Sequence, residues 1–130
     1  MPIDLTWHVL PPGVYDAVVD EVDFRFGANL SLVITYRTAH RDQEYCVEEW
    51  LTLDAPKSSS SYQRTAEGKG RVKQILSAYD EQMPDKIEPR ELIAALEGKA
   101  VRIAVTHKIT NDLPVPKVSR ILGKPEAPPT

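Results

Sequence analysis

The sequence predicts a mainly β domain with a helical insert. Five segments combine β-branched residues with alternating polarity, and the stretch between the third and the fourth changes to helical spacing. The length of 130 residues is that of one ordinary domain, which can bury a core without disulfide or metal staples. We therefore interpret residues 1–123 as a single domain and the proline-rich residues 124–130 as a disordered tail.

Composition narrows the class of protein. The hydrophobic fraction of 42% and the charged fraction of 27% are typical of a globular chain. Cys46 is the one cysteine and cannot form an internal disulfide, and the first residues lack the basic and apolar regions of a signal peptide. No apolar run is long enough to span a membrane. We expect a cytoplasmic protein without membrane contact.

The first three strands follow one another closely. A turn at residues 11–13 leads into a strand over residues 14–25, whose apolar phase slips near Asp20 and Glu21, so a bulge is expected there. Residues 30–38 alternate cleanly, with Tyr36 on the inward side. Residues 44–53 form the third strand, and its phase turns Trp50 outward.

The pattern then becomes helical. Residues 56–61 are expected to form a mobile loop, and helical spacing follows between residues 70 and 97, where Pro89 and Gly98 mark the start and the end of a second helix. Strands return at residues 99–107 and 116–122. This order, β-β-β-α-β-β, predicts an OB-fold-like five-stranded antiparallel barrel. A half-open antiparallel sheet with helices on one face is the competing arrangement.

Charge is distributed in blocks. The net charge is −3, yet residues 1–56 carry three basic and ten acidic side chains. Residues 57–75 and 99–130 are net basic, with five basic against one acidic and six against two. A phosphate-binding surface would draw mainly on these two blocks. Mixed surface charge explains the same pattern equally well.

Aromatic and basic residues interleave where an OB-type ligand face would lie. Bases stack on aromatic rings while cations follow the phosphates, so such a face binds single strands with little sequence preference. For the exposed ring of Trp50, cover by the loop after the third strand is the alternative explanation. The candidates outside the helical segment are Arg25, Phe26, Arg37, Trp50, Lys108 and Lys117.

The segment Gly68–Lys73 adds Lys69, Arg71 and Lys73 to these candidates. Glycines just ahead of a helix would leave backbone N–H groups open to an anion, with the three cations beside them. The segment lacks the spacing of a P-loop, so nucleotide hydrolysis is not implied. A loop end followed by a solvated helix face is the alternative.

No constellation predicts catalysis. The three histidines and Cys46 make no paired metal spacing, so we expect no metal and no cofactor. Asp85, Glu97 and Lys99 match the acids and lysine of a nuclease superfamily only as letters, because they are not expected on adjacent strands. Glu48 and Glu49 point to opposite faces of one strand. The chain is therefore not expected to be an enzyme.

Several turns and strands carry a family resemblance: Pro12–Ala17, Leu32–Arg37, Gly70–Leu76, Leu96–Ile103 and Val118–Gly123. Together they resemble a family of small phage and prophage proteins suspected of single-stranded DNA binding in replication or recombination, and the resemblance spans residues 11–123. It implies phage or host replication and recombination proteins as partners. The tail has no acidic tip of the kind that recruits partners in bacterial single-stranded DNA-binding proteins.

Two functions follow as hypotheses. The first is a single-stranded DNA-binding accessory protein of phage replication or recombination, with homo-oligomerisation as an open possibility. The second is a protein-interaction or assembly module that uses the same exposed strands and Trp50, which the acidic first half would tolerate better.

Overall fold

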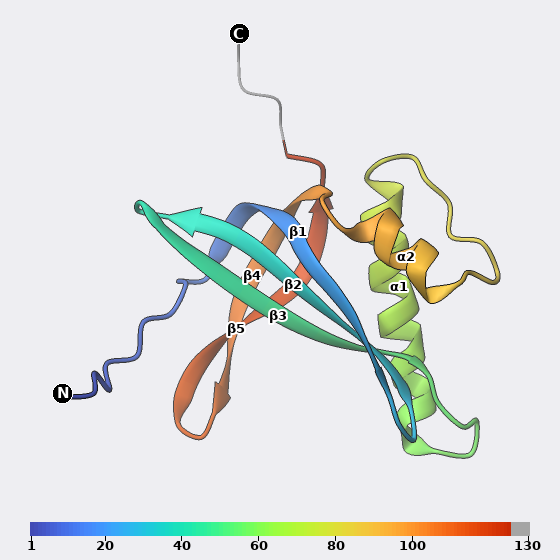
Figure 1. The fold of residues 1–130 in the computed structure, drawn as a ribbon, viewed down its shortest axis with the longest axis horizontal. Coiled ribbons are helices and arrows are strands. Elements are labelled where there is room, and N and C mark those ends of the chain that lie inside the picture. Colours follow the sequence, from blue (N-terminus) through green and yellow to red (C-terminus); the bar gives the residue numbers. More distant parts are fainter. Residues whose placement is uncertain (126–130) are drawn as a thin grey trace, which may run out of the picture.

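The computed structural model describes residues 1–125, which form five antiparallel strands in one open sheet with helices packed at one end of it (Figure 1). The predicted mainly β class with a helical insert is confirmed, and the strand bounds agree with the sequence to within a few residues. The elements are β1 (Gly13–Phe26), β2 (Leu30–His40), β3 (Gln43–Asp54), the 3₁₀ helix η1 (Ser60–Gln63), α1 (Arg64–Ser77), α2 (Pro89–Leu96), β4 (Ala100–Thr110) and β5 (Leu113–Gly123).

The strand order is β3-β2-β1-β4-β5, so β1 is central and pairs with both β2 and β4. The two remaining ladders join β2 to β3 and β4 to β5, and every pair is antiparallel. No ladder joins β3 to β5 within residues 1–125, so the sheet is open and the predicted barrel is not closed. The sheet nevertheless curls enough for parts of its two edge strands to approach each other.

A bulge in β1 fixes the position of α2. The register passes from Val19 opposite Tyr36 to Glu21 opposite Thr35, which confirms the expected irregularity near Asp20. The bulge region is bonded to the chain that follows α2: the N–H of Val22 donates to Glu97 Oε1 over 3.1 Å. The N–H of Gly98 also donates to the carbonyl of Val19 over 2.8 Å. The glutamate of the rejected nuclease match thus has a structural role.

The core lies between the concave side of the sheet and the helices. Tyr36 is fully buried, as its inward phase predicts, and Leu10 is buried just before β1. Side chains of β1, β2, β4 and both α-helices complete one continuous apolar cluster. Its largest fully buried members are Tyr36, Leu10, Leu32, Ile34, Ile75, Leu96 and Ile103.

Helix α1 begins earlier than the sequence predicts. It starts at Arg64, so Gly68 and Gly70 lie within the helix and not ahead of it. The reason lies in the packing, since a Cβ atom at Gly68 would stand 2.1 Å from the carbonyl oxygen of Thr52. The glycine lets the helix backbone approach β3 closely. The expectation of open N–H groups before the helix is therefore wrong, because helix N–H groups past the first turn bond within the helix.

Two segments that the sequence predicts to be irregular are the loop after β3 and the C-terminal tail. Part of the predicted mobile loop at residues 56–61 belongs to η1, and the N–H of Ser59 bonds to the carbonyl of Pro56. The predicted disordered tail lies outside the described residues from 126 onward, while Lys124 Nζ stands 4.6 Å from the ring centroid of Tyr79. Among residues 1–125 no helix has the length and apolar character needed to cross a bilayer.

Candidate functional site

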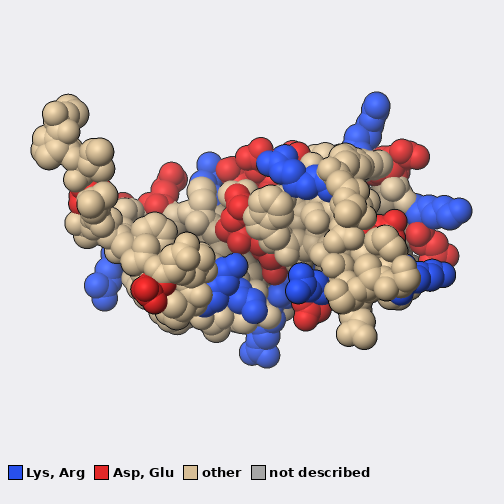
Figure 2. All heavy atoms as spheres, turned by 90° about the horizontal axis from the view of Figure 1, so that it is seen from below, with Lys and Arg blue, Asp and Glu red and all other residues tan. Residues whose placement is uncertain are grey.

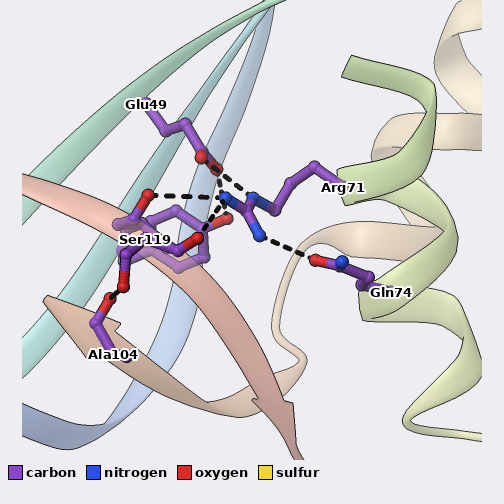
Figure 3. A network of polar contacts seen from close by, with 7 residues as sticks. Glu49, Arg71, Gln74, Ala104 and Ser119 are labelled. Carbon is purple, nitrogen blue, oxygen red and sulfur yellow. Dashed lines mark hydrogen bonds and ion pairs between the residues drawn. The ribbon is translucent and has the colours of Figure 1, made fainter. Parts of the chain in front are cut away.

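A single arginine bridges the open side of the sheet. Arg71 projects from α1, and its Nε donates to Glu49 Oε2 on β3 over 2.9 Å. Its Nη2 reaches the carbonyl oxygens of Val118 and Ser119 on β5 at 3.4 and 3.3 Å (Figure 3). Its Nη1 donates to Gln74 Oε1 over 2.7 Å. The guanidinium thus connects the two edge strands where no backbone ladder joins them.

This bridge extends into the core through Glu49. The hydroxyl of Tyr36 donates to Glu49 Oε1 over 2.8 Å, so both carboxylate oxygens are satisfied. Burial raises the pKa of Glu49 above its usual value, although Arg71 acts in the opposite direction. Burial likewise raises the pKa of Tyr36 well above the usual range, and the neighbouring carboxylate adds to the effect. The pair of Glu49 and Arg71 is a largely buried structural element.

A groove lies over the bridge, with a volume of about 680 Å³. One wall is β3, the second is the exposed side of α1, and the third is the β4–β5 hairpin. Smaller hollows, of about 360 and 180 Å³, lie beside Phe26 and beside Gly68. Besides the bridge itself, its lining includes Glu48, Trp50, Glu67, Gly70, Thr106, Lys108, Pro116 and Lys117.

Trp50 stands on the rim of this groove. Its side chain is 60% exposed, so the chain after β3 does not bury it, while its cross-strand neighbour Val33 is buried. The indole Nε1 donates to Glu48 Oε1 on the same outward face. A large ring that stays open to solvent beside a hollow offers a flat apolar surface for stacking.

Two lysines face the tryptophan side from the β4–β5 hairpin. Lys108 and Lys117 both line the groove, and neither forms an ion pair with any residue in the range 1–125. Lys117 lies close enough to Glu49 to oppose the rise of its pKa. Glu48 and Glu67 balance the two lysines. On the face of the molecule that Figure 2 draws, cationic and anionic side chains are interspersed. The groove can therefore hold an anion only locally, at its lysines.

The structure brings four of the nine predicted site residues together: Trp50, Arg71, Lys108 and Lys117. Arg71 was expected to be available to phosphate, but in the structure it bonds to other residues of the protein. Its guanidinium is engaged with Glu49 and with β5, and the side chain is only 14% exposed. A phosphate would have to displace these bonds to reach it.

Three other predicted residues lie away from the groove. Phe26 is 76% exposed at the end of β1 and stacks with Phe24, with ring centroids 6.2 Å apart. Arg25 pairs with Asp23, and Arg37 Nη1 stands 3.4 Å from Asp20 Oδ1. Because acidic neighbours neutralise both arginines, the outer face of β1 and β2 is not a cationic surface.

The three cations around Gly70 are divided between two sides of α1. Lys69 and Lys73 are one turn apart on an exposed strip of the helix and do not line the groove. Arg71 lies between them in sequence, and residues two positions apart do not share a helix face. The expected cluster beside open N–H groups is therefore not formed.

The bridge of Glu49 and Arg71 is absent from the sequence-based expectations. Glu49 occupies the inward phase of β3 between Val47 and Leu51, and a buried carboxylate requires a partner. The inward position of Glu49 could therefore have predicted a buried ion pair from the sequence, although it does not identify the cation.

The described residues do not form a cluster of metal ligands. No group of three or more His, Cys, Asp or Glu side chains that could hold an ion occurs among residues 1–125.

Comparison with known proteins adds no assignment, since neither a protein-family model nor a curated protein sequence matches the chain.

Proposed function

We propose that the chain binds single-stranded DNA in the groove between β3 and the β4–β5 hairpin, with little sequence preference. The observation that carries the proposal is the exposed ring of Trp50 beside a groove that also contains the unpaired cations of Lys108 and Lys117. A base lying on the indole would leave its phosphates within reach of the lysine side of the groove. An aromatic platform with nearby cations is the common arrangement for binding single strands.

The topology favours the same proposal. The element order β-β-β-α-β-β and the central position of β1 would suit an OB-fold whose β3–β5 ladder is missing. OB-folds are partly open barrels that bind oligonucleotides on the face of their second and third strands and on adjoining loops. In the proposed architecture the bridge of Arg71 replaces the missing ladder. This support is an analogy at the level of the fold.

The charge of the groove sets the expected strength. Two unpaired lysines allow about two phosphate contacts, so the logarithm of affinity should fall with the logarithm of salt concentration by roughly 1.4. Glu48 and Glu67 weaken the attraction further. We therefore propose weak binding, suited to an accessory role in phage replication or recombination, as the sequence resemblance implies.

An oligonucleotide titration across salt concentrations tests the proposal. Trp50→Ala should weaken binding by about 1–3 kcal/mol at every salt concentration, because one stacked base is lost. The double variant Lys108→Ala/Lys117→Ala should reduce both the affinity and the salt slope. The matched control is Lys69→Ala/Lys73→Ala, which removes the same charge from the other side of α1 and should leave the slope nearly unchanged.

Equal losses in the two double variants would show that only diffuse charge matters and would contradict the groove. Arg71 is a poor probe for DNA contact, because its removal would disturb the bridge. Quenching of indole fluorescence on adding oligonucleotide gives an independent readout. Since Trp7 also fluoresces, the same titration of Trp50→Ala supplies its background.

A protein-interaction module is the second candidate. The observation that favours it is the outer face of β1 and β2, where Arg25 and Arg37 have acidic partners and so leave little net positive charge to attract phosphate. If no oligonucleotide binds below about millimolar concentration at low salt, this second function becomes the better account.

A further inference from the structure

The N-terminal segment has the sequence pattern of a strand but belongs to none. Apolar residues occupy every odd position from Met1 to Val9, and the even positions between them hold Pro2, Asp4, Thr6 and His8. Such strict alternation is the signature of a half-buried strand. In the structure these residues lie outside the sheet and extend away from the body of the domain (Figure 1).

The apolar side chains at the beginning of this segment have no cover. Ile3 and Leu5 are 83% and 89% exposed. Within residues 1–125, the backbone of residues 1–9 forms no backbone hydrogen bond to another segment. A strand pattern that leaves both its apolar side and its backbone groups unpartnered predicts that its partner is another chain.

The root of the segment is fixed to the domain. Leu10 is buried in the core, and its carbonyl stands 2.7 Å from His107 Nε2. Trp7 Nε1 donates to the carbonyl of Pro114 on β5 over 2.6 Å. Residues 1–6, which we call the arm, therefore project from a fixed point and can span roughly 20 Å when extended.

One stretch of sheet edge is free to accept an added strand. The two-residue turn at Arg41 and Asp42, both with positive φ, closes the β2–β3 hairpin on the pair of His40 and Gln43. Because hydrogen-bonded and non-hydrogen-bonded pairs alternate from there, every second residue of β3 directs its N–H and C=O away from β2. Over the first half of β3 these residues are Glu44, Cys46 and Glu48.

The other edge positions are protected. On β5, the residues that point away from β4 by the same alternation include Pro114 and Pro116, which have no N–H to donate. The second half of β3 is covered by α1, which approaches the carbonyl of Thr52 at Gly68. The bridge of Arg71 occupies the carbonyls of β5 farther along. The first half of β3 is thus the exposed edge with both donors and acceptors.

We propose that the arm of a second copy of this chain pairs with the edge of β3 at residues 44–48, so that the protein associates through arm exchange. The added strand would satisfy the free backbone groups of Glu44, Cys46 and Glu48. Its apolar side would cover the half-buried ring of Tyr45 on the concave face. Each chain has one arm and one free edge, so two chains can exchange them reciprocally in a closed dimer.

Disulfide trapping tests the contact directly, because Cys46 is exposed, is the one cysteine and lies at the centre of the proposed edge. A chain carrying Asp4→Cys with Cys46→Ser is mixed with the unaltered chain under mild oxidation, because the even positions of the arm share the outward face of Cys46 when its apolar positions cover Tyr45. A covalent heterodimer should form in high yield. The matched control is Gln82→Cys with Cys46→Ser, whose new thiol is also exposed but lies in the connection between α1 and α2 and should give little cross-linking.

Sedimentation supplies the second readout. The unaltered chain should dimerise with rising concentration, whereas Ile3→Asp/Leu5→Asp should remain monomeric. Its unfolding midpoint should equal that of the unaltered chain at high dilution, where both are monomers, since both side chains are exposed in the single chain. Three results would overturn the proposal. These are an unaltered chain that stays monomeric throughout, a dimer that survives in the arm variant, and an intrachain disulfide in Asp4→Cys with Cys46 retained.

Discussion

Arg71 on α1 and Glu49 on β3 form an ion pair, with Nε 2.9 Å from Oε2, at the point where the two edges of the sheet approach each other (Figure 3). Because the same guanidinium bonds to two carbonyl groups of β5, one side chain connects a helix and both edge strands. The groove proposed to bind DNA has this bridge as its floor.

Replacement of Arg71 by alanine should destabilise the domain by about 3 kcal/mol. The substitution leaves the carboxylate of Glu49 buried without its cation, and such a loss typically costs more than the intact pair contributes. Urea denaturation followed by circular dichroism measures the change. Lys73→Ala, which removes an exposed cation from the same helix, should stay within about 0.5 kcal/mol of the unaltered chain.

A double substitution separates the pair from its partners. Glu49→Gln/Arg71→Met removes both charges, so it should recover part of the stability that Arg71→Ala loses. If Arg71→Ala unfolds at the same urea concentration as Lys73→Ala, the bridge contributes nothing and the edges are held together by other contacts.

Two glycines of α1 should respond to alanine in opposite directions. Alanine at position 68 would place Cβ 2.1 Å from the carbonyl oxygen of Thr52, so the helix must shift from β3 and stability should fall by about 1–3 kcal/mol. At Gly70 a Cβ meets nothing within 4 Å, and alanine should stabilise the helix by about 0.5–1 kcal/mol. Thermal unfolding of the two variants side by side measures both effects. A Gly68→Ala protein as stable as Gly70→Ala would show that α1 does not depend on this approach.

Gly68 shows why sequence-based prediction found the strands but missed the start of α1. Strands could be predicted because alternation and turn residues are local signals, and even the bulge near Asp20 appears as a slip of phase. The start of α1 could not, because Gly68 disfavours a helix locally and is required only by the distant backbone of Thr52. Packing between elements overrode the local preference.

The site could be predicted only in part for a similar reason. Trp50 was correctly placed outward, because strand phase determines the face of a residue. The cations could not be assigned, since their availability depends on partners far away in sequence. Arg71 is engaged by Glu49, whereas Lys117 has no ion pair within the described chain.

The ionisation of Glu49 should make stability depend on pH. Burial raises the pKa of Glu49 in the folded state above its usual value of 4.5. In the pH interval between these two pKa values, the folded chain holds a proton that the unfolded chain has already lost. By linkage, the contribution of this group to the free energy of unfolding falls as pH rises through that interval. Glu49→Gln cannot ionise, so the stability of the unaltered chain relative to this variant should decrease as the pH rises above 4.5, the usual pKa of a glutamate. A relative stability that increases over this range would mean that Arg71 outweighs the effect of burial.

Glu48 offers a test that distinguishes DNA binding from protein binding at the same groove. Its carboxylate accepts a hydrogen bond from Trp50 Nε1, so it stands beside the surface on which a base would stack. A phosphate entering the groove would be repelled by this charge, and the repulsion between exposed charges a few ångströms apart is on the order of 1 kcal/mol. Glu48→Gln keeps an oxygen that can accept the indole bond and removes the charge. The variant should therefore bind an oligonucleotide about two- to fivefold more tightly at low salt, and the gain should shrink as salt is added.

Glu44→Gln is the matched control, because it makes the same change on β3 outside the lining of the groove and should shift affinity much less. Fluorescence anisotropy of a labelled oligonucleotide measures all three proteins under one set of conditions. Weaker binding in Glu48→Gln would mean that the carboxylate itself contacts the ligand, as expected for a partner that presents cations or hydrogen-bond donors and not phosphates.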